Sequence, residues 1–424
     1  MLKFTGFQVR WCFPLCFAAI IAVSAPARAN ETYRDYMAAA ATAFESEDWA
    51  ALDIALENAQ QLRPYSLYVW KNRILAKILL GEKEEALALT KEIADRGLSM
   101  SMTGHAALEA FAASDAFSVI ADRMKRNLRP IGMGTIVLNG RQADLLPEAV
   151  APYPGKSILI GSVRSGAITA YDTAGGSNVL ATAPGGVFDL EVRKNIVWAA
   201  VNNQLAYVKE KDAAPFAAVI GFDADTGDIL HEFQIDGEES LFGDIEISKN
   251  GTIFASDSIT PQIIWKAPKD QSLSQYLTDP RFVNLQGIAL DERKKRLFVA
   301  DYLAGLFVID TKTKEVTNIA NKTTGWLGGI DGLYYTKGCL LGVQNGTTPQ
   351  RLVKACLNKR GTEIKSFEVL QQALSEWREP THGFVVGNNL IYIATSNWPS
   401  YAEDGDVRDP ESLKPILIMS TPIN

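Results

Sequence analysis

From about residue 130 onward, apolar and polar residues alternate in short runs that are separated by turn sequences. The runs are rich in β-branched residues, and Asp225-Thr226-Gly227 and Asn250-Gly251 are typical of tight turns. A period of two places every second side chain on the same face of an extended chain. The pattern therefore predicts many short β-strands.

Six segments of this region share one design: a polar residue, an apolar strand, a tight turn and a second strand. They are PEAVAPYPGKSILIGSVRSGAITAYD, FDLEVRKNIVWAAVNNQLAYV, GDIEISKNGTIFASDSITPQIIWKA, LQGIALDERKKRLFVADYLAGLFVID, IDGLYYTKGCLLGVQNG and THGFVVGNNLIYIATSNW. Their spacing of roughly 40 to 60 residues predicts a mainly β fold, a six-bladed β-propeller over residues 130–424. A seven-bladed propeller or a β-sandwich is the alternative. The run GTIVLNG, residues 134–140, precedes the first copy and would close the ring by pairing into the last blade.

The residues before 130 follow a helical period and contain almost no proline. A shift of 34 residues places Leu52 over Ala86 and Ala59 over Ile93, which is the period of tetratricopeptide (TPR) units. We therefore predict an α-helical, TPR-like domain over residues 30–129, with a groove for a protein or peptide partner. The alternative is a short helical cap packed against the next domain. The change in composition predicts that these helices can be removed without unfolding the propeller.

The first 29 residues have the pattern of a secretory signal peptide. Lys3 and Arg10 form a basic start, residues 13–23 are apolar, and Ala27-Arg28-Ala29 matches a small-x-small cleavage site. An uncleaved membrane anchor is the alternative, although the apolar stretch is shorter than the ~20 residues that span a bilayer. No later segment is apolar enough to span one. We predict a periplasmic or secreted protein with no membrane span after cleavage.

The charge balance restricts the class of partner. The chain has 42 Lys and Arg against 49 Asp and Glu, a formal net charge of −7. Removing residues 1–29 takes away Lys3, Arg10 and Arg28, which leaves 39 basic against 49 acidic residues, or −10. Because phosphate binding needs a basic face, nucleic acid is not expected as a partner.

Two cysteines, Cys339 and Cys356, remain after the signal peptide is removed. The stretches KGCLLGVQ and RLVKACLN flank a short loop, and the cysteines are equidistant from its centre. That spacing places them opposite each other on antiparallel strands, where Cα atoms lie ~4.5–5.5 Å apart. A disulfide accepts such a separation, and an exported protein meets oxidising conditions. We predict a disulfide.

Each of the six segments begins with a polar residue at the head of its first strand. In a propeller the first strands line the central channel, so we expect these heads to converge on one ring. Carboxylates that close repel one another unless a cation or protons neutralise them. A hard divalent metal such as Ca²⁺, bound by oxygen ligands, is the simplest solution, and capping by solvent or backbone N–H groups is the alternative. The six heads are Glu148, Asp189, Asp244, Gln286, Asp331 and His382.

The stretches PEAV (147–150), LQGIALDERKKRLFVADY (285–302) and GIDGL (329–333) resemble the SMP-30/gluconolactonase/LRE-like propellers, relatives of paraoxonase and strictosidine synthase. The resemblance spans roughly residues 140–420. It implies one calcium or similar divalent ion in the channel, held by a Glu of the first blade, two Asn of middle blades and an Asp of a later blade. Carried over to this chain, the metal ligands are Glu148, Asp244, Gln286 and Asp331.

The chain departs from that family at the middle blades. Asp244 and Gln286 stand where the family has Asn. The sugar lactonases also place an Arg shortly before the middle-blade Asn, and this chain has Ser240-Leu241-Phe242-Gly243 there. The main reason to expect a gluconolactonase is therefore missing.

Two functions remain open from the sequence. In the first, the protein is a metal-dependent hydrolase: the ion polarises the carbonyl of a small-molecule lactone or ester, and Asp331 or His382 is the base. In the second, it is a non-catalytic binding or scaffold protein whose helices hold a partner. The G-x-S-x-G, H-E-x-x-H and P-loop motifs, which would indicate other chemistries, are absent from the sequence.

Overall fold

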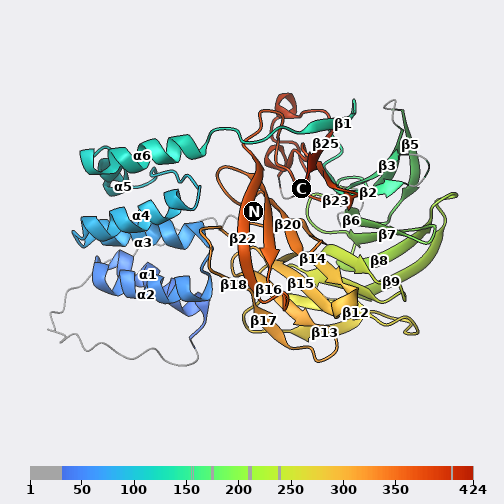
Figure 1. The fold of residues 1–424 in the computed structure, drawn as a ribbon, viewed down its shortest axis with the longest axis horizontal. Helices are drawn as coiled ribbons and strands as arrows, with labels where there is room; N and C mark the ends of the chain where they lie inside the picture. Colours follow the sequence, from blue (N-terminus) through green and yellow to red (C-terminus); the bar gives the residue numbers. More distant parts are fainter. Residues whose placement is uncertain are drawn as a thin grey trace.

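The structure, a computed structural model of the 424-residue chain, places a group of helices beside a β-propeller (Figure 1). It describes residues 31–153, 155, 157–172, 176–208, 213–236, 240–402 and 404–423. The predicted signal peptide lies outside the described residues. Within them, no helix has both the length and the apolar character needed to cross a bilayer.

Six α-helices precede the sheets in the described part of the chain. They are α1 (Tyr33–Glu45), α2 (Trp49–Leu62), α3 (Leu67–Leu79), α4 (Lys83–Asp95), α5 (Ala106–Ala112) and α6 (Asp115–Asn127). Side chains of Thr32, Asp48 and Ser66 cap the first three helices by accepting backbone N–H groups. The starts of α1 and α3 are 34 residues apart, as are those of α2 and α4, so the predicted period is real.

Six antiparallel sheets form the blades, which confirms the six-bladed propeller. Blade 1 contains β2 (Pro147–Tyr153), β3 (Ser157–Ser162), β4 (Ala167–Tyr171) and β5 (Ser177–Thr182). Blade 2 contains β6 (Gly186–Arg193), β7 (Ile196–Asn202), β8 (Phe216–Asp223) and β9 (Ile229–Asp236). Blade 3 contains β10 (Phe242–Ile247), β11 (Ile253–Asp257), β12 (Gln262–Lys266) and β13 (Ser274–Thr278).

The last three blades complete the ring. Blade 4 contains β14 (Leu285–Asp291), β15 (Arg296–Asp301), β16 (Gly305–Asp310) and β17 (Val316–Asn318). Blade 5 contains β19 (Leu333–Thr336), β20 (Cys339–Gln344), β21 (Arg351–Leu357) and β22 (Glu363–Gln372), with β18 (Ala320–Asn321) parallel to β22. Blade 6 contains β23 (Gly383–Val386), β24 (Asn389–Ile393), β25 (Leu417–Pro422) and β1 (Thr135–Asn139). The pairing of β1 with β25 confirms the predicted closing strand.

The propeller core is divided among its blade interfaces. Six clusters of buried apolar side chains each join two neighbouring blades, such as Ala149 with Val187 between blades 1 and 2. The first strands contact one another in the order β2, β6, β10, β14, β19 and β23, and β23 contacts β2 again. The heads of these strands therefore surround one channel, as the sequence predicted.

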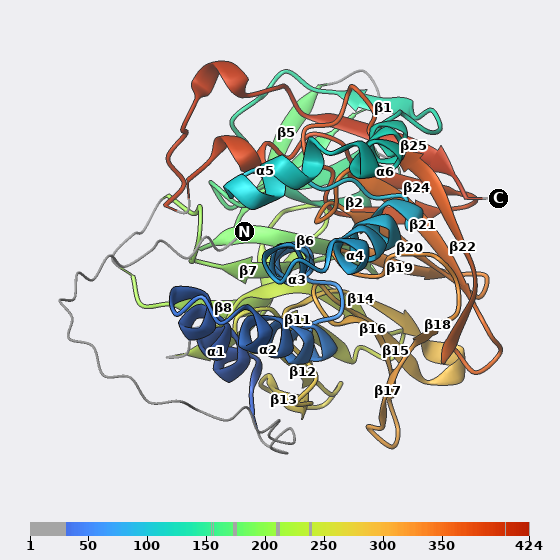
Figure 2. The ribbon, with the colours of Figure 1, turned by 90° about the vertical axis from the view of Figure 1, so that its left-hand side faces the viewer.

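The helices share a core with blade 5. Trp326, from the loop before β19, is 1% exposed and lies in the same apolar cluster as Trp70 and Ile93 of the helices. Tyr65 lies against Gly305 and Gly328, where an added Cβ would meet it at 2.6 and 2.2 Å. Figure 2, seen from the helical side, shows the helices in front of the sheets. This shared core argues against the separability that composition predicted.

Hydrogen bonds join the helical region to the same part of the propeller. The Ser99 N–H donates to the Thr348 carbonyl at 2.7 Å. The Gln372 amide donates to the carbonyls of Asn127 and Arg129 at 2.9 and 2.8 Å. The helical region therefore contacts blade 5 through backbone groups as well as through apolar side chains.

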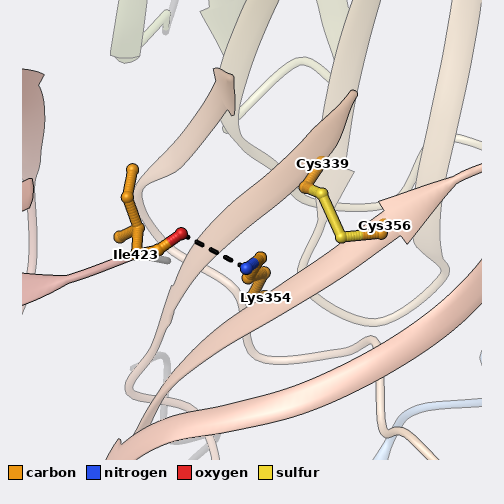
Figure 3. Close-up of a disulfide and its surroundings, with 4 residues drawn as sticks. All are labelled: Cys339, Lys354, Cys356 and Ile423. Atoms are coloured by element: carbon orange, nitrogen blue, oxygen red, sulfur yellow. Dashed lines mark hydrogen bonds between the residues drawn. A yellow bond between two sulfur atoms is a disulfide. The ribbon is translucent and has the colours of Figure 1, made fainter. Parts of the chain in front are cut away.

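Cys339 and Cys356 form the predicted disulfide (Figure 3). They are directly opposed in the β20–β21 pair, with Cα atoms 3.9 Å apart. Close by, the Lys354 ammonium donates to the Ile423 carbonyl at 3.2 Å and ties the C-terminal segment to blade 5. A disulfide that closes so short a loop stabilises a fold by about 3 kcal/mol.

Candidate metal and catalytic site

Every first strand carries a β-bulge at its head. In blade 5 the Val343 backbone bonds both Asp331 and Gly332, and in blade 6 Ile393 bonds both Thr381 and His382. Bulges turn side chains out of the regular alternation and are frequent next to active sites. The bulges thus aim the polar heads at the channel. In blades 1 to 4 the shifts of register lie between Pro147 and Ala149, Val187 and Asp189, Phe242 and Asp244, and Leu285 and Ile288.

Three of the six predicted heads form one cluster, which we call the channel triad: Glu148, Asp331 and His382. One ligand atom from each lies within 4.8 Å of the others. The three side chains are buried, with residue exposures of 7, 8 and 3%. In the described part of the chain, this is the one group of three or more His, Cys, Asp or Glu residues that could hold a metal ion.

Neighbouring side chains fix the two carboxylates of the channel triad. Glu148 Oε2 accepts a hydrogen bond from Trp398 Nε1 at 2.5 Å. Trp398 begins the short 3₁₀-helix η2 (Trp398–Ser400). Asp331 Oδ2 accepts a hydrogen bond from Asn345 Nδ2 at 2.6 Å. One oxygen of each carboxylate is therefore held, and the other is directed toward the triad.

His382 lies between two carboxylates. Its Nδ1 is 3.5 Å from Asp189 Oδ1, and its Nε2 is 3.9 Å from Asp331 Oδ1. Burial alone would lower the pKa of His382, but the hydrogen bond to Asp189 and the charges of Asp331 and Asp189 raise it to about 10. Without a bound cation, the imidazole is therefore protonated at neutral pH.

The remaining acids near the triad hold protons more tightly than usual. Burial, and then the charge of Asp331, raises the pKa of Glu148 to about 8. Burial also raises the pKa of Asp331. Glu379 lies just before blade 6, and burial together with the Asp331 charge raises its pKa to about 7. A divalent cation would relieve this repulsion between buried carboxylates.

Asp189 and Asp244 occupy a different position from the triad. Each stands one residue past the bulge, paired with Ala200 and Ser256 respectively. Asp189 Oδ2 accepts the N–H of Ile245 at 3.0 Å, from the first strand of the next blade. This contact matches the backbone capping that the sequence left open as the alternative role of the heads.

The same contact recurs in the next blade and one layer further along the channel. Asp244 Oδ2 accepts the N–H of Ile288 at 2.8 Å. Glu191 accepts the N–H of Ile247 at 2.5 Å, and Glu246 accepts that of Leu290 at 3.1 Å. First strands of adjacent blades do not pair as a sheet, so these carboxylates satisfy N–H groups that would otherwise be buried without a partner. We call the four residues Asp189, Glu191, Asp244 and Glu246 the bridging carboxylates.

The metal ligands expected from the resemblance are only partly brought together. Glu148 and Asp331 lie in the channel triad, whereas Asp244 exchanges a hydrogen bond with Asp189. Gln286 is half-buried and donates from Nε2 to Asn284 Oδ1 at 2.8 Å. Ligation by Asp244 and Gln286 therefore stays a prediction.

Sequence reasoning missed four residues around the triad: Asn345, Trp398, Glu379 and Tyr302. Asn345 had a detectable signal, because it is a polar residue that directly follows the buried strand β20. Trp398 is 250 residues from its partner Glu148, and nothing in the local pattern relates the two. Tyr302 and Glu379 lie in loops that the repeat pattern did not cover.

The donor set fits a divalent ion. Two carboxylates and an imidazole offer oxygen and nitrogen ligands from three separate strand heads. A metal-bound histidine usually directs its second ring nitrogen to a carboxylate, and Asp189 stands at that place beside His382 Nδ1. The triad could therefore hold a metal without rearrangement of its supports.

No protein-family model and no curated protein matches this chain. Solved structures with a similar arrangement include a PQQ-bound aldose sugar dehydrogenase from Streptomyces coelicolor, 16% identical, covering 69% of this chain and 99% of that one, with a TM-score of 0.48. A putative glucose dehydrogenase from Thermus thermophilus is 16% identical over 68% and 99%, with a TM-score of 0.47. A gluconolactonase from Xanthomonas campestris is 11% identical over 66% and 87%, with a TM-score of 0.45. These similarities concern the fold, a six-bladed β-propeller, and the chemistry must be argued from this chain's own residues.

Proposed function

We propose that this protein is a divalent-metal-dependent hydrolase that opens a lactone or a related small ester at the channel triad. The observation that carries the proposal is the convergence of Glu148, Asp331 and His382, all buried, within 4.8 Å. Buried groups of this kind are expensive to maintain and are concentrated at functional sites. A purely structural ring would be expected to cap backbone groups, as the bridging carboxylates do.

Glu148, Asp331 and His382 would hold the ion, and Asp189 would orient the imidazole. A divalent ion bound there would act as a Lewis acid toward the carbonyl oxygen of the ester. Calcium was expected from an all-oxygen ligand set, but an imidazole is more typical of zinc and other transition metals. We therefore propose Ca²⁺ or another divalent ion, with Mn²⁺ and Zn²⁺ as the competing candidates.

Hydrolysis adds water across the acyl C–O bond, so a base must take one proton and the leaving oxygen must receive one. Asp331 and His382 are the bases predicted from the sequence. Glu379 is a further candidate, because its pKa of about 7 lies near neutral pH, where a general base works best. Its burial and its place beside the Asp331 charge keep it close to the triad.

The test combines ion binding with turnover. Binding of Ca²⁺, Mn²⁺, Mg²⁺ and Zn²⁺ to the purified chain is measured by titration calorimetry, and each loaded form is assayed on a panel of lactones and esters. We expect binding and turnover in the wild type and the loss of both in Glu148→Gln. A chain that binds none of the four ions would overturn the proposal.

A second function is favoured by a cavity between the helices and the propeller. This junction cavity has a volume of about 310 Å³. Its lining includes Tyr65, Trp70, Arg73 and Arg96 from the helical region and Trp326 from the propeller. A non-catalytic binding protein would hold its protein or peptide partner there. Ion binding without turnover on any ester would favour this alternative.

We further propose that the protein works in the periplasm or outside the cell. The Cys339–Cys356 disulfide supports this location, because disulfides persist in oxidising compartments. Labelling of free thiols in protein taken directly from the periplasmic and cytoplasmic fractions tests it. Unlabelled, disulfide-bonded chain in the periplasmic fraction is the expected result.

A further inference from the structure

Asn345 connects the channel triad to a tyrosine of the neighbouring blade. Its Nδ2 donates to Asp331 Oδ2 at 2.6 Å, and its Oδ1 accepts the hydroxyl of Tyr302 at 2.9 Å. Burial keeps the pKa of Tyr302 well above its ordinary value, so the phenol remains a donor. The tyrosine thus sets which end of the Asn345 amide faces Asp331, and the amide sets which carboxylate oxygen faces His382.

Tyr302 itself is tightly confined. Its carbonyl accepts the N–H of Gly329 at 2.8 Å, and its ring covers Gly346. A Cβ added at Gly346 would lie 2.4 Å from the tyrosine ring and hydroxyl, so a single methyl group there would displace Tyr302. This position thus offers a way to disturb Tyr302 while leaving its hydroxyl in place.

The helical region braces Asn345 from one side. Gln344 precedes Asn345 and is fully buried, and its Oε1 accepts Arg351 Nε at 2.8 Å. Arg351 is 1% exposed and donates from Nη1 to the carbonyl of Arg96, which caps the C-terminus of α4, at 3.1 Å. The path from α4 to Asn345 therefore consists of two hydrogen bonds and one peptide bond.

The helical region braces Tyr302 from the other side. The N–H of Tyr65, in the loop between α2 and α3, donates to the carbonyl of Leu303 at 3.0 Å. Leu303 directly follows Tyr302, and the Tyr65 ring lies against Gly305 of the same loop. Both side chains that determine the orientation of Asp331 are thus adjacent to residues that the helices hold.

We propose that the helical region is a positioning element of the channel site, acting through Arg351, Asn345 and Tyr302 on the carboxylate of Asp331. Its functional meaning rests on the proposed function, in which Asp331 is a metal ligand. The positioning itself is a statement about the Asp331 side chain and can be tested with or without a metal. Asn345 and Tyr302 are positioning residues, because each acts through Asp331.

The first test measures the affinity of the full chain for Mn²⁺ alone, together with its melting temperature. We expect binding at least ten-fold weaker in Asn345→Ala and about three-fold weaker in Tyr302→Phe and Gly346→Ala, at nearly unchanged melting temperature. Asn203→Ala is the matched control. Asn203 also follows the second strand of its blade and makes two hydrogen bonds, but these go to the Ala214 carbonyl and the Phe216 N–H. Wild-type affinity in Asn345→Ala would overturn the proposal.

The second test addresses the helical contact. Arg351→Lys keeps a buried cation but cannot donate to both Gln344 and the Arg96 carbonyl, so we expect Mn²⁺ binding about three-fold weaker. Crystal structures of Asn345→Ala and Arg351→Lys should show Asp331 rotated away from His382. If the wild type binds no ion, the proposed function fails, and these structures still decide the positioning. An unchanged Asp331 side chain in both variants would overturn it.

Discussion

Blades 2 and 3 and blades 5 and 6 use polar strand heads in opposite ways. In blades 2 and 3 the bridging carboxylates each accept an N–H from the next first strand. In blade 5 the hydroxyl of Tyr334 takes that place and accepts the N–H of Gly383 at 2.5 Å. Asp331 is therefore released from this structural task and faces His382 instead.

The difference shows that residue type and ring position do not define a role in the channel. Four carboxylates were expected to share one cation, yet they divide into two that connect blades and two that converge with His382. The helical region is joined to blades 4 and 5, on the side of the ring where the heads are free of backbone partners. Support from the helices accompanies the freedom of the functional groups.

Removing the helices should have the largest effect. A chain of residues 130–424 would expose Trp326 and leave the Arg351 guanidinium without its partner on α4. We expect a loss of about 4 kcal/mol or more in the free energy of unfolding, since truncating a buried Trp costs about 3–5 kcal/mol. Urea denaturation followed by circular dichroism measures it. A fragment as stable as the full chain would show that the shared core contributes little.

Asp331→Asn should separate ion binding from folding. The substitution nearly keeps the shape of the side chain and its contact with Asn345, so the ion-free variant should melt near the wild type. A ligand at a hundred times its Kd stabilises the folded state by about 2.7 kcal/mol. The wild type should show this gain in saturating Mn²⁺ or Ca²⁺, and the variant should show much less. Equal gains in the two proteins would remove Asp331 from the ligand set.

Asp244→Ala should show the reverse behaviour. It leaves the Ile288 N–H buried without an acceptor, which costs about 1–3 kcal/mol of stability, whereas Mn²⁺ affinity should stay the same. Asp244→Asn keeps an acceptor oxygen and is the matched control. If the alanine variant loses ion affinity but keeps its stability, Asp244 is a ligand, as the family resemblance implied.

Glu191→Gln should alter the pH dependence of stability. Burial raises the pKa of Glu191 to about 7 in the folded protein, whereas an ordinary Glu titrates near 4.5. The folded state therefore keeps a proton that the unfolded chain releases, and this stability is present below about pH 4.5 and lost as pH rises through 7. The variant has no proton to lose, so at pH 8 it should be more stable than the wild type by about 1–2 kcal/mol. Chemical denaturation at pH 4 and 8 measures the difference, and equal differences at both would contradict it.

The sequence predicts the large features of this fold because repetition and period determine them. Six copies of one strand pattern indicate six blades, and the spacing of Cys339 and Cys356 about a loop indicates their opposition. The bulges could not be foreseen, and a shift of one residue changes which way a side chain points. Asp189 and Asp244 were therefore aligned with Glu148, although they stand past the bulge while Glu148 stands within it.

The closing strand β1 has a consequence for how the chain reaches its final state. Thr135 pairs with Ser420, so the ring becomes continuous only when the two distant ends of the propeller sequence meet. Such non-local pairing is slow to form, because loop closure must come before the contacts that reward it. The helices, which precede β1, can fold early, before the outermost strand of blade 6 has a partner. A chain that is made or exported from its N-terminus therefore stays an open arc until its last residues arrive.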